Sequence, residues 1–120
     1  MSPAWLMLIA AGLLEIVWAV AMKYSNGWTR LKPSILTLVA MLASFYLLSR
    51  AMKDLPAGTA YAAWVGIGAV GVALYGMLHL GEPATTARLL CLVLIVGGVV
   101  GLKVLTPTNH TAPPTPFATP

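Results

Sequence analysis

The chain has 120 residues, of which 59% are hydrophobic and only 8% are charged. Soluble domains carry about 25% charged residues, so this composition excludes an ordinary soluble protein. It predicts an all-α membrane protein. Seven basic residues against three acidic ones give a net charge of +4. Because basic residues of membrane proteins usually flank the spans, nucleic acid is not an expected partner.

Four membrane spans are expected, because a helix needs about 20 apolar residues to cross the hydrocarbon core. The first apolar stretch lacks the basic start and the cleavage site of a signal peptide, so we interpret it as a retained span. Short connections make neighbouring helices antiparallel. The expected transporter domain covers residues 1–105, with spans at about 3–22, 33–52, 59–80 and 85–105.

The remaining residues, 106–120, are rich in Pro and Thr and are expected to form a disordered tail. His110 falls there and is expected to be solvated. Cys91 is the single cysteine, so we expect no disulfide framework, metal site or other cofactor. The chain also lacks a G-x-x-x-x-G-K-[ST] loop, which excludes ATP-driven transport by this chain alone. We expect no enzymatic activity and no catalytic residues.

Glu15 is the residue that points most directly to a function. Every other residue from Ala4 to Met22 is apolar or glycine. A charged residue at the centre of a span costs about 2.5–3.5 kcal/mol on insertion scales, and such residues mark ion or substrate pathways. We therefore expect the Glu15 carboxylate to bind a cation or a proton.

Several residues are candidates to surround this carboxylate. Gly12 and Trp18 lie three residues before and after Glu15, on the same helical face. Gly12 permits close helix approach, and the Trp18 indole N–H can reach a carboxylate. Ser44 lies in the middle of the second span, where packing and a site role are both possible.

One face of the third span combines aromatic rings with glycines at a spacing of three and four residues: Tyr61, Trp64, Gly68, Gly71 and Tyr75. Gly66, Gly68 and Gly71 each weaken the helix relative to alanine. They are interpreted as a bend that lets the helix take two shapes, and a plain packing face is the alternative. The rings suit a delocalised or alkylated cation, and a planar guanidinium forms paired hydrogen bonds with a carboxylate.

The fourth span is interpreted as an oligomerisation helix, because glycines allow close helix contacts and Gly97, Gly98 and Gly101 cluster there. A single copy has too few helices to enclose a cation site. A second copy would bring two Glu15 side chains into one cavity. Two carboxylates in an apolar site do not both ionise readily, so protons and a cation would compete for them.

The basic residues predict no fixed orientation in the membrane. One side carries three of them and the other side carries four: Arg50, Lys53 and Lys103 against Lys23, Arg30, Lys32 and Arg88. Because an excess of basic residues marks the cytoplasmic side, this balance is typical of a dual-topology protein. A fixed topology set by other cues is the alternative.

At these residues the chain resembles the small multidrug resistance family, and within it the guanidinium-exporter subtype. The resemblance covers roughly residues 1–105. It rests on GLLEIVWAVAMKYS around Glu15, on GTAYAAWVGIGAVG in the third span and on the closing GLK at residues 101–103. Drug-exporting relatives typically have a small residue where Trp18 stands.

The resemblance implies an antiparallel dual-topology homodimer in the bacterial cytoplasmic membrane that exports guanidinium in exchange for protons. It implies that Glu15 binds both ions and that the site is lined by Gly12, Trp18, Ser44, Tyr61 and Trp64. Gly66 and Gly68 match the family's bend. The family's dimer motif has two glycines seven residues apart; Gly98 fits the second and Cys91 stands at the first, while Gly101 lies nearby.

Two other functions fit the same residues. One is an exporter of small quaternary ammonium or guanidinyl compounds, although Trp18 argues against bulky drugs. The other is a membrane subunit that does not transport by itself or that pairs with a homologue. A buried acid argues against a purely structural role, and the balanced charges argue against an obligate heterodimer partner.

Overall fold

The computed structural model describes residues 2–106, which form four α-helices and so confirm the expected all-α fold. The predicted tail, with His110, lies outside the described residues except for Thr106. The helices follow one another in the order α1 (Pro3–Tyr24), α2 (Leu31–Ala51), α3 (Ala57–His79) and α4 (Thr86–Leu105).

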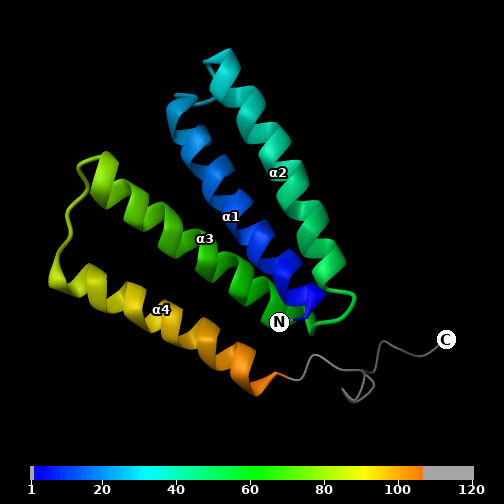
Figure 1. Cartoon of the computed structure of the whole chain (residues 1–120). Coiled ribbons are helices and arrows are strands. Elements are labelled where there is room, and N and C mark those ends of the chain that lie inside the picture. Colours follow the sequence, from blue (N-terminus) through cyan, green and yellow to red (C-terminus); the bar gives the residue numbers. More distant parts are fainter. Residues whose placement is uncertain (1, 107–120) are drawn as a thin grey trace.

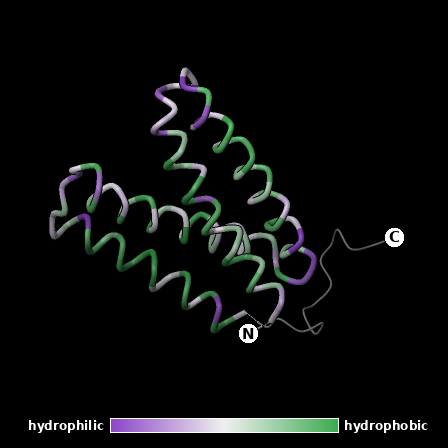
Figure 2. The backbone as a smooth tube through the Cα atoms, turned by 45° about the horizontal axis from the view of Figure 1, so that its top comes forward, coloured by the Kyte–Doolittle hydropathy of each residue, from purple (hydrophilic) through white to green (hydrophobic). Residues whose placement is uncertain are grey.

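Each of the four helices is long and apolar enough to cross a membrane. Their lengths of 20 to 23 residues match the about 20 residues that a bilayer core requires. Figure 2 shows that the hydrophilic stretches gather mainly at the turns between helices, whereas the helices themselves are largely hydrophobic. Because the spans are α-helical, their backbone N–H and C=O groups pair within each helix, as a hydrocarbon environment demands.

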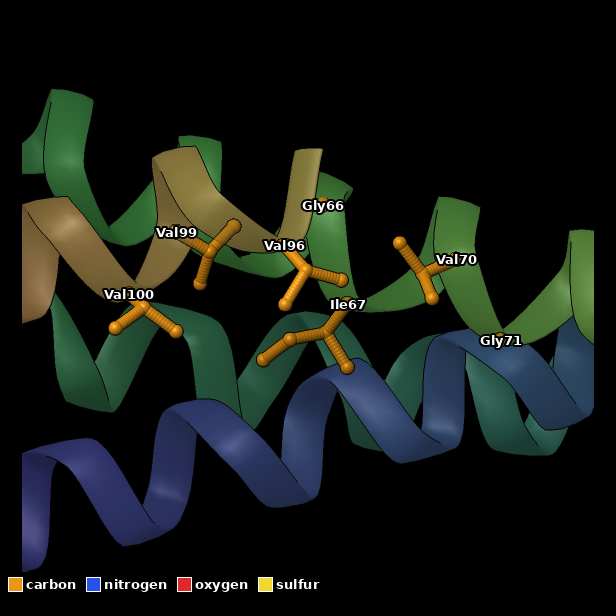
Figure 3. Close-up of a pocket in the computed structure, with 7 residues that line it drawn as sticks. All are labelled: Gly66, Ile67, Val70, Gly71, Val96, Val99 and Val100. Atoms are coloured by element: carbon orange, nitrogen blue, oxygen red, sulfur yellow. The ribbon is translucent and has the colours of Figure 1, made fainter. Parts of the chain in front are cut away.

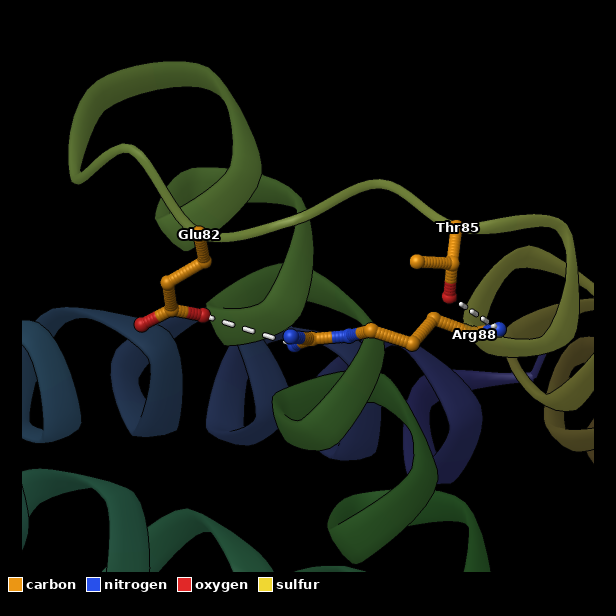
Figure 4. Close-up of polar contacts among 3 residues, drawn as sticks. All are labelled: Glu82, Thr85 and Arg88. Atoms are coloured by element: carbon orange, nitrogen blue, oxygen red, sulfur yellow. Dashed lines mark hydrogen bonds and ion pairs between the residues drawn. The ribbon is translucent and has the colours of Figure 1, made fainter.

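Polar side chains make contacts within both turns at one end of the molecule. Between α1 and α2, Asn26 and Gly27 adopt positive φ angles of 50° and 73°, and the fully buried Ser25 hydroxyl donates to the Met22 carbonyl at 2.7 Å. Between α3 and α4, the Glu82 Oε1 atom lies 3.5 Å from the Arg88 Nη2 atom and forms an ion pair with it (Figure 4). The Thr85 hydroxyl accepts a hydrogen bond from the Arg88 backbone N–H and caps α4.

The helices form two side-by-side pairs, α1 with α2 and α3 with α4, which cross at an angle (Figure 1). Helix α1 packs mainly against α2 and then against α3, whereas α4 packs mainly on α3. Lys103 of α4 also reaches α1, with its Nζ atom 5.6 Å from the centre of the Trp5 ring. The pairs are close at the end that holds the start of α1 and diverge toward the opposite end. The buried core gathers at the close end and includes Trp5, Leu8, Leu48, Ala60 and Trp64.

Candidate cation-binding site

Helix α1 places Glu15 against α3 at a point where both helices carry glycine instead of larger residues. A Cβ added at Gly68 would overlap the Glu15 carboxylate, and one added at Gly12 would lie 2.6 Å from Ile67 Cγ2. A Cβ added at Gly71 would overlap the Ile16 side chain. Glycines therefore let α1 and α3 approach closely around the carboxylate. Any larger residue at position 68 would occupy the space that the acid now fills.

The Glu15 carboxylate keeps binding capacity that its own chain does not use. Its Oε1 atom is buried and has no hydrogen-bond partner among the described residues, and the same holds for Trp18 Nε1. The remainder of the Glu15 side chain is only partly covered. The sequence placed Trp18 within reach of the acid, but within the described chain the two groups do not bond to each other. The hydrogen-bonding capacity of both atoms is therefore unused within the described chain.

Ser44 connects three helices one turn away from the acid. Its side chain is 0% exposed. Its hydroxyl donates to the Ala11 carbonyl of α1 at 2.7 Å and accepts from Trp64 Nε1 of α3 at 3.0 Å. The hydroxyl thus uses its donor and an acceptor lone pair in a fixed direction. This arrangement holds the Trp64 ring in place relative to the stretch of α1 that carries Glu15.

A row of aromatic rings continues from Trp18 across the site. The Trp18 and Phe45 rings lie 6.2 Å apart, the Phe45 and Trp64 rings 5.6 Å apart, and the Trp64 and Tyr61 rings 5.6 Å apart. Trp64 is buried, whereas Tyr61 is 55% exposed at the edge of the row. Sequence reasoning did not single out Phe45. Its position beside Ser44 on α2 was the available signal.

Helix α3 is continuous from Ala57 to His79, and its glycines face different neighbours. Gly68 faces Glu15 of α1, whereas a Cβ at Gly66 would lie 2.6 Å from Val99 Cγ2 of α4. Both glycines therefore serve close packing in this conformation. The bend inferred from Gly66 and Gly68 stays a proposal.

A cavity of about 260 Å³ between α3 and α4 contains no group that could hold a cation (Figure 3). Its wall is made by aliphatic side chains and glycines: Gly66, Ile67, Val70, Gly71, Val96, Val99 and Val100. The Glu82 carboxylate already forms an ion pair with Arg88 in the α3–α4 turn. Glu15 is therefore the acid that lies within a span and has free binding capacity.

None of the residues of α4, all of which the structure describes, is buried. A Cβ added at Gly97, Gly98 or Gly101 would meet no atom within 4 Å, and Cys91 is exposed. The residues expected to pack against a second copy are therefore uncovered in the single chain.

A family comparison identifies the chain. The family described as Small Multidrug Resistance protein matches residues 3–95, which include the whole site around Glu15. The chain belongs to the small multidrug resistance family. The resemblance stated from the motifs is thereby confirmed, and the four apolar helices are those of a multi-pass protein of the bacterial cytoplasmic membrane.

Family members with high identity carry names that describe export. A guanidinium exporter from Yersinia pseudotuberculosis serotype I (strain IP32953) is 62% identical over 100 residues, which cover 83% of this chain and 96% of the relative. A guanidinium exporter from Citrobacter freundii is 59% identical over 103 residues, which cover 86% of this chain and 98% of the relative. These names describe transporters.

The buried hydroxyl of Ser44 gives the first testable prediction. Replacing Ser44 with Ala leaves the Trp64 indole N–H buried without its acceptor and removes the bond to α1. An unsatisfied buried donor costs about 1–3 kcal/mol, so the midpoint of thermal unfolding in detergent should fall clearly.

The matched control is Ser49→Ala on the same helix. Ser49 is exposed, and its hydroxyl donates to the Tyr46 carbonyl of its own helix. Unfolding midpoints that agree between the two variants would contradict the connecting role of Ser44.

Proposed function

We propose that this protein exports guanidinium in exchange for protons, and that Glu15 binds both ions. The observation that carries the proposal is the Glu15 carboxylate oxygen, buried within a span and without a hydrogen-bond partner in the described chain. A buried acid of this kind needs a cation or a proton. The high identity to proteins named guanidinium exporters supports guanidinium as the cation.

The chemistry of guanidinium matches the groups around Glu15. The ion is planar and donates two parallel hydrogen bonds to one carboxylate, a geometry that fixes its orientation. Its flat face favours aromatic rings, and the row from Trp18 through Phe45 to Trp64 offers such rings. A bulky cation would compete with Trp18 for the same space. This arrangement favours a small planar substrate over a large drug.

Exchange follows from the use of one acid for two ligands. A proton on Glu15 removes the charge that holds guanidinium, and bound guanidinium disfavours protonation. Protons entering from one side of the membrane therefore release the cation there. A conformational change that exposes Glu15 to the two sides in turn then couples the two flows. The chain needs no nucleotide and no other cofactor for this cycle, and the reaction requires no bond making in the substrate.

We further propose that the working unit is an antiparallel homodimer of chains inserted in both orientations. The partly covered Glu15 side chain supports this, because one chain does not enclose it. The glycines on α4 also favour contact with a second copy, since nothing in the described chain covers them. Cys91 stands beside this face and would change the detail of the contact. The near balance of basic residues at the two ends supports dual insertion.

Removal of the Glu15 charge tests the central role of this residue. Purified protein in liposomes with a pH gradient should take up radiolabelled guanidinium, and Glu15→Gln should lower the rate about 100-fold or more. The amide replaces one acceptor oxygen with an NH2 group and removes the charge that strengthens both hydrogen bonds, each worth about 1.5–3 kcal/mol when charge-assisted, and each 1.4 kcal/mol is tenfold. Glu82→Gln is the matched control, because its carboxylate already pairs with Arg88. Unchanged uptake in Glu15→Gln would overturn the proposal.

The space at Gly68 gives a second test of the same site. Gly68→Ala should displace the Glu15 carboxylate and weaken guanidinium binding at least about tenfold, because paired hydrogen bonds depend on geometry. Binding is measured by calorimetry in detergent. Gly58→Ala on the same helix is the control, since a Cβ there meets no atom within 4 Å. Equal affinities of the two variants would show that Gly68 does not shape the site.

The orientation of the chains can be tested in cells. A reporter fused after Leu105 should give signal on both faces of the membrane, because the basic residues are nearly balanced between the two ends of the molecule. The measurement compares a cytoplasmic and a periplasmic reporter at the same position. A signal on one face alone would contradict dual insertion, while leaving guanidinium transport to be judged by the liposome assay.

A further inference from the structure

An open groove runs along the surface of α1, bordered by α2 and α3, at the end of the molecule that holds the α1–α2 turn. It consists of two adjoining hollows of about 370 Å³ and 350 Å³, which share Ala21, Tyr24 and Leu36. The inner end of the groove begins at Ile16. The outer end reaches Lys32, the second residue of α2. The groove therefore joins an apolar wall within the spans to a basic residue at their end.

The groove lies on the face of α1 that points away from Glu15. At about 100° per residue, Val17, Val20 and Tyr24 lie about 140–200° around the helix from Glu15. Val17, Tyr24 and Leu36 are 41–51% exposed, so the described chain leaves the groove open. A second copy that encloses the partly covered Glu15 would meet the opposite side of α1. Because the helices are long and apolar enough to span a membrane, the groove is left to lipid.

The outer end of the groove is basic. The segment from Lys23 to Lys32 contains three basic residues and no acidic one. Lys32 lines the groove and is exposed. The first turn of α2 contains no acidic residue, and the helix dipole places partial positive charge there. A negatively charged group is therefore stabilised beside Lys32.

Aromatic residues place this end of the groove at the level of the lipid headgroups. Trp28 of the α1–α2 turn is 50% exposed, and Trp and Tyr gather at membrane–water interfaces. The Tyr24 and Tyr75 hydroxyls share a hydrogen bond of 2.8 Å, and their rings meet edge to face. The shared bond uses one of the two hydroxyl protons. The other proton can be donated to a headgroup oxygen.

We propose that the groove binds one acyl chain of an anionic phospholipid and that Lys32 binds the phosphate of this lipid. From Ile16 to Tyr24 the groove runs for about 12 Å, at 1.5 Å per residue. The acyl chain lies along this length, and the tyrosine hydroxyls meet the polar groups that follow it. A zwitterionic headgroup carries its own cation beside the phosphate, so Lys32 favours an anionic lipid. The site is separate from Glu15 and does not rest on the exporter function.

Native mass spectrometry of the full chain in detergent measures the binding of single lipids. The parent should bind dioleoyl phosphatidylglycerol about fivefold more tightly than dioleoyl phosphatidylcholine, at one lipid per chain. Lys32→Gln should lower the affinity for phosphatidylglycerol about fivefold, the ratio expected for one cation beside an anionic headgroup. Lys53→Gln is the matched control, because Lys53 is exposed in the α2–α3 turn, lies next to Asp54 and does not line the groove.

The acyl-chain part of the site is tested with Val20→Trp, because the indole ring would fill the groove. This variant should bind both lipids at least about tenfold more weakly, the ratio expected when about two methylene groups lose their burial. Leu6→Trp is the control, since Leu6 is an exposed residue of α1 that does not line the groove. Its lipid affinities should equal those of the parent.

Several outcomes would overturn the proposal. Equal affinities of the parent for the two lipids would do so, as would equal losses in Lys32→Gln and Lys53→Gln, because the headgroup would then not be read by Lys32. Unchanged binding in Val20→Trp would show that the groove holds no acyl chain. Displacement of the lipid by soluble glycerol 3-phosphate at the same concentration would assign the basic end to a free phosphate.

The same spectra report the mass of the protein assembly. Loss of a dimer in Val20→Trp but not in Leu6→Trp would assign the groove to a second copy of the chain and would overturn the lipid site. Lipid binding is measured without transport. A failure of this proposal therefore leaves guanidinium export to be judged by the liposome assay.

Discussion

The contact of the Glu15 carboxylate with the backbone of α3 at Gly68 is the constraint on which the site depends. An acid inside a span is costly, so the surrounding residues must leave it reachable by a ligand while excluding lipid. Glycine at position 68 provides the space, and Gly12 and Gly71 bring the two helices close on either side. The carboxylate therefore lies in a narrow contact between α1 and α3 and not on an open helix surface.

Helix α2 gives this contact its rigidity. The Ser44 hydroxyl bonds to the α1 backbone and accepts from the Trp64 indole, while Phe45 connects the rings of Trp18 and Trp64. A row of rings whose members are fixed by packing and hydrogen bonds presents a prepared surface to a flat cation. Such preparation lowers the entropy lost on binding.

The helices pack around a buried core at one end of the molecule and diverge at the other end, and this asymmetry fits a transporter. The core around Trp5 and Leu8 holds α1, α2 and α3 together near the start of the chain. Toward the other end α1 and α3 diverge, and one hydrogen bond between Tyr24 and Tyr75 connects them. Alternating access requires parts that move against a fixed site. A firm core beside a weakly joined end meets that requirement.

The sequence by itself determined the four apolar helices, because span length and composition alone define them. It also identified Glu15, because an acid among apolar residues has no structural reason to be there. It also pointed to Ser44 and Trp64 as candidates. Only the tertiary structure decided that Ser44 and Trp64 bond to each other, that Gly66 faces α4 while Gly68 faces Glu15, and that Tyr24 meets Tyr75. Helical periodicity tells which residues share a face. It does not tell which neighbour that face meets, since the packing of the other helices sets this.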